Sequence, residues 1–321
     1  MTIVFSPKYR VDIGRHVFPT EKYCLVAEQL TLDTIEPETA TWDQLALVHT
    51  PEYLDKMRYG HMSPEDVAQL ELPWSEEMVD GFRLMAGGTI LAARLAAGVG
   101  TPSAPGHSFS ASSANSAFNV ACHIGGGLHH AFPNHGEGFC PFNDVAVAVR
   151  VLQAEGIERH AIVDLDVHHG NGTAFIFGSP GPGAPRDGDG DARVFTFSMH
   201  QQDNYPMWKP KGSLDIGLPG GVHDRTYLEA LERALPQVLA HRPQCVFYLA
   251  GADPFEDDQL GGLRLTKAGL RARDRMVIAA AASAGIPLVI TLAGGYARRI
   301  EDTVAIHCAT IEEALRAASG S

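Results

Sequence analysis

The sequence has few cysteines and few positive charges for its length, and both shortages exclude whole classes of protein. Its five cysteines, among 321 residues, are odd in number and form no CxxC pair, so they indicate neither a disulfide framework nor a zinc ribbon. The 25 Lys and Arg residues are outnumbered by 38 Asp and Glu residues, which gives a formal net charge of -13. Since nucleic-acid binding draws on basic surfaces, we expect no direct nucleic-acid partner. The cysteine usage fits a reducing compartment, so we expect a cytoplasmic protein.

Long uninterrupted apolar segments are also missing, apart from one stretch near the C-terminus. Residues 276–297 carry no charge and reach the length of a membrane span. Gly285 and Pro287 interrupt the stretch. Because proline disfavours helix at the residue before it, the pattern favours an Ala-rich helix followed by a Val/Ile strand. The first residues lack the basic and apolar regions of a secretory signal, and we expect no membrane partner.

Three motifs that mark common enzyme classes are absent as well. The chain contains no GxxxxGK[ST] phosphate loop, no GxSxG nucleophile elbow and no strand-GxGxxG-helix unit. Nucleotide chemistry and serine-hydrolase chemistry therefore lack the local structures that they need.

What the sequence does contain is a regular alternation of short apolar runs with longer helical patterns. The expected strands lie at residues 161–168, 192–200, 244–253 and 287–296, and the expected helices at 75–98, 143–156, 225–242 and 266–285. Strands that are apolar throughout and alternate with helices indicate a parallel sheet covered on both faces. No repeat or shift in composition divides the chain, so we expect a single α/β domain over residues 1–321.

The stretch DLDVHH, residues 164–169, places three polar side chains at the end of an apolar strand. Asp164, Asp166 and His168 are separated by single apolar residues, and alternate side chains of an extended strand point the same way. Burying carboxylates without a partner costs too much free energy to happen without compensation. The pattern therefore indicates that a cation lies among them.

Three further expected strands also end in polar residues. They are followed by Ser198 and His200, by Asp253, and by Gly294, Gly295 and Tyr296. Because ligands bind beyond the carboxyl ends of the strands in open parallel sheets, we expect these groups to converge. Asp166, His168 and Asp253 offer two oxygens and one nitrogen, which suits zinc with an open position for water and substrate. Each residue alone would be interpreted as a cap or a satisfied core residue, but the set favours a metal site.

Two adjacent histidines, His129 and His130, follow three glycines in GGGLHHAF. Glycine lets the backbone approach a ligand closely, and histidines carry protons near neutral pH. Taken alone, such a pair is equally compatible with a structural role.

Five motifs in order, GGGLHHAF, EGFCPFND, DLDVHHGNGT, GADPFEDDQLGGLRLT and LAGGY, resemble those of the zinc-dependent histone deacetylase family, in particular its bacterial and class IV members. The resemblance spans about residues 120 to 296 and implies the arginase-deacetylase fold, a mainly parallel sheet of about eight strands flanked by helices. It also implies roles for individual residues of this chain. The implied zinc ligands are Asp166, His168 and Asp253. The implied catalytic residues are His129, His130, Tyr296 as oxyanion donor and Asp164 as the partner of His129. A potassium ion would be surrounded by Asp164, Asp166, His168, Ser198 and Met199, and the substrate would be contacted by Gly138, Phe139, Tyr205, Gly294 and Gly295.

One position departs from much of the family. Asn171 stands where many members have an Asp that pairs with the second histidine. The missing negative charge should make His130 less basic, which leaves the identity of the general base open. The segment HQQDNYPMWKPKG, at the expected channel entrance, lacks family landmarks, so the preferred acyl group is open too.

The sequence thus predicts a zinc-dependent amidohydrolase that removes acyl groups from lysine side chains of proteins. A deacetylase of acylated polyamines or other small amides would use the same site, and a catalytically silent acyl-lysine reader is disfavoured by His129, His130 and Tyr296. A binuclear manganese ureohydrolase needs Asp-x-His-x-Asp, whereas this chain has Asp-x-Asp-x-His. The oligomeric state is open.

Overall fold

The centre of the molecule is one sheet of parallel strands. The computed structural model describes residues 1–100, 118–178 and 190–320, and seven strands within these ranges pair in the order β1-β2-β7-β6-β3-β4-β5. They are β1 (Thr2–Val4), β2 (Val120–His123), β3 (His160–Asp164), β4 (Val194–Gln201), β5 (Leu214–Leu218), β6 (Cys245–Leu249) and β7 (Leu288–Thr291). The predicted α/β fold with a parallel sheet is confirmed, with seven described strands where about eight were expected.

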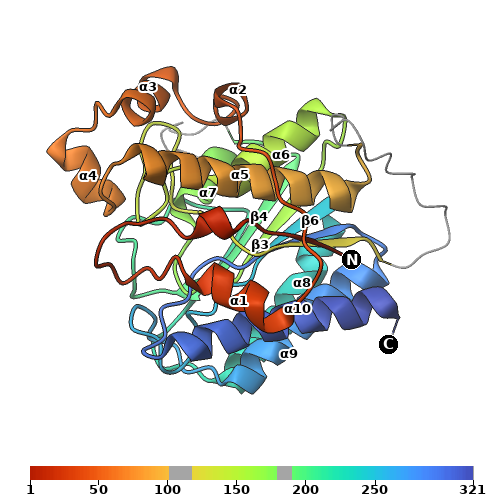
Figure 1. Cartoon of the computed structure of the whole chain (residues 1–321). Coiled ribbons are helices and arrows are strands. Elements are labelled where there is room, and N and C mark those ends of the chain that lie inside the picture. Colours follow the sequence, from red (N-terminus) through yellow and green to blue (C-terminus); the bar gives the residue numbers. More distant parts are fainter. Residues whose placement is uncertain (101–117, 179–189, 321) are drawn as a thin grey trace.

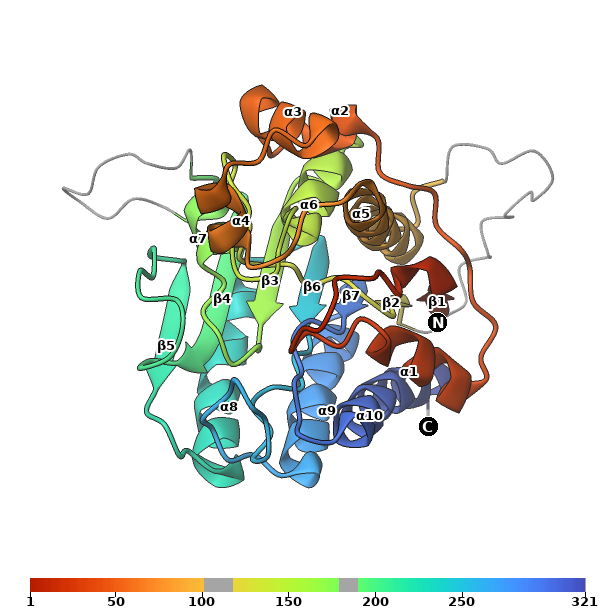
Figure 2. The same ribbon diagram turned by 60° about the vertical axis from the view of Figure 1, so that its left-hand side comes forward.

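Helices cover both faces of this sheet (Figure 1). Seen along the sheet in Figure 2, α2 to α6 form one layer, while α1 and α8 to α10 form the other. The helices are α1 (Lys22–Leu30), α2 (Trp42–Leu45), α3 (Pro51–Tyr59), α4 (Pro64–Leu70), α5 (Glu76–Ala97), α6 (Asp144–Ala154), α7 (Asn171–Phe177), α8 (Asp224–Ala240), α9 (Lys267–Ser283) and α10 (Ile300–Ser319), with a 3₁₀ turn at Pro7–Tyr9. Because both faces are covered, the strands can be apolar throughout.

Local signals explain where the longest predicted helices begin and end. The Ser75 hydroxyl accepts a hydrogen bond from the Met78 amide at the start of α5, and Gly98 ends this helix in the left-handed conformation, as capping preferences predict. Helix α9 ends at Ser283 and β7 begins at Leu288. The uncharged stretch 276–297 is therefore a helix followed by a strand, as expected. None of the helices described in the structure combines the length and apolarity of a membrane span.

The strands that the sequence pattern missed are short or lie at the sheet edge. Strand β1 has three residues and β2 has four, too few for a periodic pattern to stand out. Strand β5 forms the edge beside β4, and its residues alternate between exposed and partly buried. Strands β3 and β6 have five residues each, lie inside the sheet and are buried along their whole length, so they form apolar runs long enough to be visible in the sequence.

Candidate metal centre and active site

The segment after β3 holds the polar side chains predicted to gather there. Strand β3 ends at Asp164, so strand alternation accounts for Asp164 only, and Asp166 and His168 lie in the bend that follows. Their positions come from carboxylates that accept backbone amides: Asp164 Oδ1 accepts from the Asp166 amide at 3.2 Å, and Asp166 Oδ1 accepts from the His168 amide at 2.9 Å. Such turns are typical of Asp because its short side chain reaches its own backbone two residues on.

Asp166, His168 and Asp253 form the predicted metal-binding group. One ligand atom of each lies within 4.8 Å of the others, and all three residues are buried. His168 Nδ1 lies 3.0 Å from Asp166 Oδ1 and 3.4 Å from Asp253 Oδ2. Burial and the adjacent Asp166 carboxylate raise the pKa of Asp253 to about 7. A cation bound between the two carboxylates would offset their repulsion and favour the ionised form of both.

Two further observations show that this group fits a metal ion. Asp253 Oδ1 accepts from the Val167 amide at 2.9 Å, while the buried Oδ2 has no hydrogen-bond partner among the described residues. A Cβ atom on Gly294 would lie 2.1 Å from Asp253 Oδ2 and 2.5 Å from Asp166 Oδ2. The glycine therefore keeps open the space around the two carboxylates, and the donor set suits zinc.

His129 lies beside this group and pairs with a buried carboxylate. Its Nδ1 is 2.6 Å from Asp164 Oδ2, and its Nε2 is 3.8 Å from Asp166 Oδ1. Burial acts to lower the pKa of His129, but the two carboxylates outweigh it and raise that pKa to about 9. His129 is therefore suited to carry a proton at neutral pH.

His130 has a different partner. Its Nδ1 lies 2.7 Å from Asn171 Oδ1, and its Nε2 lies 3.1 Å from Nε2 of His129. Burial, followed by the positive charge of His129, holds the pKa of His130 well below its usual value, and the hydrogen bond with Asn171 acts in the opposite direction. His130 is therefore neutral near pH 7, the form in which an imidazole can accept a proton.

Tyr296 is fixed through its backbone. Asp258 Oδ2 accepts from the Tyr296 amide at 2.7 Å, and the Gln259 amide and side chain both donate to the Tyr296 carbonyl, at 3.1 and 2.9 Å. Burial and the carboxylates of the metal group hold the pKa of Tyr296 well above its usual value, so the phenol stays protonated. The sequence pattern did not single out Asp258 and Gln259, although both lie in a quoted motif, because a carboxylate that folds back onto a distant amide leaves no local pattern.

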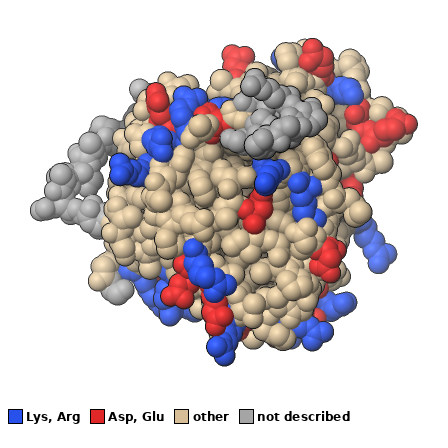
Figure 3. Space-filling view, turned by 180° about the vertical axis from the view of Figure 1, so that it is seen from behind, with Lys and Arg blue, Asp and Glu red and all other residues tan. Residues whose placement is uncertain are grey.

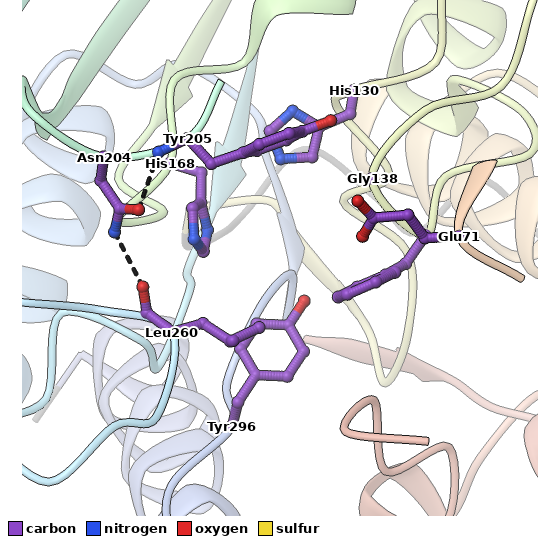
Figure 4. A pocket seen from close by; sticks show the side chains of 9 residues that line it. Glu71, His130, Gly138, His168, Asn204, Tyr205, Leu260 and Tyr296 are labelled. Atoms are coloured by element: carbon purple, nitrogen blue, oxygen red, sulfur yellow. Dashed lines mark hydrogen bonds between the residues drawn. The ribbon is translucent and has the colours of Figure 1, made fainter. Parts of the chain in front are cut away.

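A pocket leads from the surface to these side chains (Figure 4). Its wall contains the predicted Gly138, Phe139 and Tyr205, together with Glu71 and Leu260, which the sequence did not indicate, and it reaches His130, His168 and Tyr296. Asn204 connects two parts of the wall, since its side chain accepts from the Tyr205 amide at 2.7 Å and donates to the Leu260 carbonyl at 2.8 Å.

Backbone conformation brings the wall close to the histidines. Gly138 has a φ of 53°, and a Cβ there would lie 2.8 Å from His130 Cδ2 and 3.0 Å from the Tyr205 ring. Phe139 follows with a φ of 65°, a left-handed conformation that is costly for a residue other than glycine. Its amide donates to the Leu70 carbonyl at 3.0 Å, which helps to hold it there.

The two remaining predicted substrate residues, Gly294 and Gly295, lie in different surroundings. Gly294 lines a second, deeper cavity beside the metal group. Gly295 lines neither pocket; a Cβ there would meet Thr303 at 2.8 Å and Ala252 at 2.9 Å. Close packing, rather than contact with the pocket, explains this second glycine.

Three residues of the predicted potassium set lie on neighbouring strands. Asp164 and Ser198 are direct neighbours in the pairing of β3 with β4, and Met199 follows Ser198 on β4. The Ser198 hydroxyl lies 3.0 Å from Nδ1 of His200. Potassium binding by this set stays a prediction.

Comparison with known proteins identifies the family. The histone deacetylase domain family matches residues 16–311, so the chain belongs to that family, and the resemblance seen in the sequence is confirmed. An uncharacterized protein of Picosynechococcus sp. is 39% identical over 315 residues, which cover 95% of both chains. Histone deacetylase 2 of Arabidopsis thaliana is 28% identical over 95% of this chain and 78% of its own length. The crystal structure of a histone deacetylase homologue from Aquifex aeolicus shares the fold, with a TM-score of 0.73 at 21% identity over 98% of this chain and 83% of that one.

The protein is thus a hydrolase of the deacetylase family with a buried Asp-His-Asp metal site. Outside the site, the face shown in Figure 3 carries Lys and Arg residues interspersed with Asp and Glu residues among uncharged ones. The expectation that nucleic acid is not a direct partner stays a prediction.

Proposed function

We propose that this protein hydrolyses the amide bond of acylated lysine side chains in proteins, with Zn²⁺ held by Asp166, His168 and Asp253. The observation that carries the proposal is that one pocket reaches His130, His168 and Tyr296, while a second cavity that shares these residues is lined by His129 and Asp166 of the same buried group. Figure 4 shows the hydroxyl of Tyr296 pointing into that pocket. The product would be a free lysine and a carboxylate.

The proposed zinc would use two carboxylates and one imidazole and keep a coordination position open. When bound there, it would supply Lewis acidity toward the acyl carbonyl and lower the pKa of a water molecule. Because the same ligands accept iron(II) and cobalt(II), metal analysis of the purified protein belongs to the first experiment.

Three side chains of the site then carry the proton movements and the charge. His130, whose pKa is low, accepts the proton of the attacking water. His129, whose pKa is about 9, donates a proton to the leaving amine. Tyr296 donates a hydrogen bond to the carbonyl oxygen as negative charge develops there, a contribution that is typically worth a factor of about a hundred or more.

The pocket wall supports a substrate with a straight aliphatic chain. Phe139 packs edge-on against Tyr296 at a ring distance of 6.0 Å, and Tyr205 contacts the ring of His130 at 5.0 Å. The two aromatic side chains offer apolar surface to methylene groups, and Gly138 lets the Tyr205 ring lie close to the backbone of the wall. Pockets of this kind, apolar with a few convergent polar groups, suit ligands of limited width.

A second substrate class has one observation in its favour. The carboxylate of Glu71 lines the pocket mouth and would attract a second amino group of an acylated polyamine or another small cationic amide. Polyamine deacetylation would use the same catalytic side chains, so only substrate comparison separates the two.

We also propose a structural potassium ion among Asp164, Asp166, His168, Ser198 and Met199. The adjacency of Asp164 and Ser198 across β3 and β4 supports it. For the compartment we propose the cytoplasm, in keeping with the five free cysteines.

The first experiment measures the release of acyl groups from lysine peptides that carry acetyl, lactyl, butyryl and long-chain modifications, with acetylated polyamines alongside. We expect turnover of the peptides that a chelator abolishes and added zinc restores. Turnover of polyamines alone would move the function to small amides, and no turnover on any substrate would contradict the proposal.

Two variants test the assignments within that assay. Tyr296→Phe should lower kcat by about a hundredfold with unchanged metal content, whereas Tyr59→Phe, at an exposed tyrosine of α3, should have no effect. Gly294→Ala should lose bound metal because the new methyl group occupies the ligand space, and Gly100→Ala, where a Cβ meets nothing within 4 Å, is its control. Full metal content in Gly294→Ala would refute the placement of the ion.

A further inference from the structure

Glu137 precedes Gly138 of the pocket wall, and its carboxylate has four hydrogen-bonding partners. Oε1 accepts from Asn171 Nδ2 at 2.6 Å and from the Tyr205 hydroxyl at 2.9 Å, and Oε2 lies 3.3 Å from both Gln69 Nε2 and His135 Nε2. Although burial opposes it, these hydrogen bonds hold the pKa of Glu137 below its usual value. The carboxylate is therefore ionised and can only accept hydrogen bonds.

An ionised Glu137 determines which way the Asn171 amide faces. The amide has an NH₂ end that can only donate and an oxygen end that can only accept. Since Glu137 requires the NH₂ end, the oxygen faces Nδ1 of His130, 2.7 Å away. His130 must then carry its proton on Nδ1, so its Nε2, which lies 3.1 Å from Nε2 of His129, is unprotonated and can accept a proton.

The same carboxylate oxygen fixes a part of the channel. The centroid of the Tyr205 ring lies 5.0 Å from that of His130 and 6.2 Å from that of His168. The position of Glu137 is itself restrained, because its amide and carbonyl pair with the carbonyl and amide of Cys140 at 3.2 and 2.9 Å. One carboxylate on a rigid turn thus contacts both the partner of a catalytic histidine and the channel wall.

We propose that Glu137 is a positioning residue that fixes, through Asn171, the tautomer of His130 and holds Tyr205 in the channel wall. The catalytic consequence rests on the proposed function, whereas the tautomer does not. Glu137 orients His130 indirectly, because the amide of Asn171 lies between them. The site therefore keeps a defined proton acceptor although no carboxylate contacts His130. No local sequence pattern indicates this, since Glu137 is 34 residues from Asn171 and 68 from Tyr205.

The test combines two substitutions with a control. Glu137→Ala removes the acceptor, and Glu137→Gln removes the charge but keeps a carbonyl oxygen that can accept from Asn171 and Tyr205. Glu155→Ala removes a glutamate that pairs with Arg94 at the C-terminal end of α6 and serves as the control. Each protein is prepared with histidine labelled with ¹⁵N, and the ring nitrogens of His130 are assigned with a His130→Ala spectrum.

We expect the wild type and Glu137→Gln to show the Nδ1–H tautomer of His130, and Glu137→Ala to show a mixture or the Nε2–H form. In peptide deacylation, Glu137→Ala should lower kcat by about tenfold to a hundredfold and raise KM, with most of kcat restored in Glu137→Gln. Glu155→Ala should change neither the tautomer nor kcat.

The outcomes separate the two hypotheses. A tautomer that is the same in Glu137→Ala and the wild type would overturn the positioning role, whatever the activity. A loss of kcat in Glu155→Ala equal to that in Glu137→Ala would also overturn it, because the loss would then be structural. A changed tautomer in a protein that deacylates no substrate would support the positioning role and refute the proposed function.

Discussion

His129 and His130 are neighbours in the sequence, and their Nε2 atoms lie 3.1 Å apart, but their Nδ1 atoms meet different partners. His129 faces the buried carboxylate of Asp164, and His130 faces the neutral amide of Asn171. The pKa of the first is raised to about 9, and that of the second is held well below its usual value. These surroundings therefore favour the charged form of one ring and the neutral form of the other.

This difference shows how a chain can obtain an acid and a base from the same residue type. The charged ring also lowers the proton affinity of its neighbour, because two adjacent imidazolium ions would repel each other. The asymmetry is thus reinforced within the pair as well as imposed by Asp164 and Asn171. This asymmetry implies different catalytic roles for His129 and His130, and substitutions can test each role.

The largest expected effect comes from removing the rings one at a time. Both His130→Ala and His129→Ala should lower kcat on acyl-lysine peptides by about 10² to 10⁴, the usual contribution of general acid–base catalysis. An acyl ester with a nitrophenolate leaving group needs no proton on departure. We therefore expect His129→Ala to retain most of its activity on the ester, and His130→Ala to lose it there too.

The control for these two variants is the metal content, which should match that of the wild type. The opposite pattern on the ester, with His130→Ala active and His129→Ala inactive, would exchange the two roles.

A smaller effect is expected from making the two surroundings alike. Asp164→Asn places an amide beside His129, so the pKa of that ring falls and its orientation weakens. Loss of such a partner typically costs about tenfold to a hundredfold in activity. We expect kcat to fall by this amount, measured with and without added potassium, while Asp80→Asn at an exposed aspartate has no effect. Recovery in potassium would assign the loss to the ion instead of His129.

The sequence predicted the ligands of the metal group because their pattern is local. Asp166 and His168 follow a strand that is visible as an apolar run, and Asp253 follows another. Parallel topology brings the strand ends together, so their convergence could be predicted from the sequence. Gly138, Phe139 and Tyr205, by contrast, were predicted only through the family resemblance.

The residues that orient the site were not predictable in this way. Asp258 and Glu137 act through side chains that reach amides or hydroxyls far away in the sequence. Which of several acidic residues in a loop turns inward depends on the packing of the whole loop. Strand β5 was missed for a related reason, since an edge strand has no continuous apolar pattern to reveal it.

The smallest expected effect comes from giving His130 a carboxylate partner like that of His129. Asn171→Asp alone places two carboxylates in contact, because Glu137 Oε1 lies 2.6 Å from the side chain at this position. Carboxylates so close share a proton, and His130 gains little negative charge. Combining Asn171→Asp with Glu137→Gln removes this conflict and gives His130 a carboxylate partner like that of His129.

In the double variant the pKa of His130 should rise, since a carboxylate favours the charged ring. A general base must be unprotonated, so the acidic limb of the kcat/KM profile should move to higher pH, by about one unit. Activity should fall at the acidic end of the profile, where His130 becomes protonated, and change little above pH 8. The profile of the single Asn171→Asp variant should move less than that of the double variant. An acidic limb in the double variant that coincides with that of the wild type would show that His130 is not the group whose protonation limits the reaction, and the base would then have to be sought at His129.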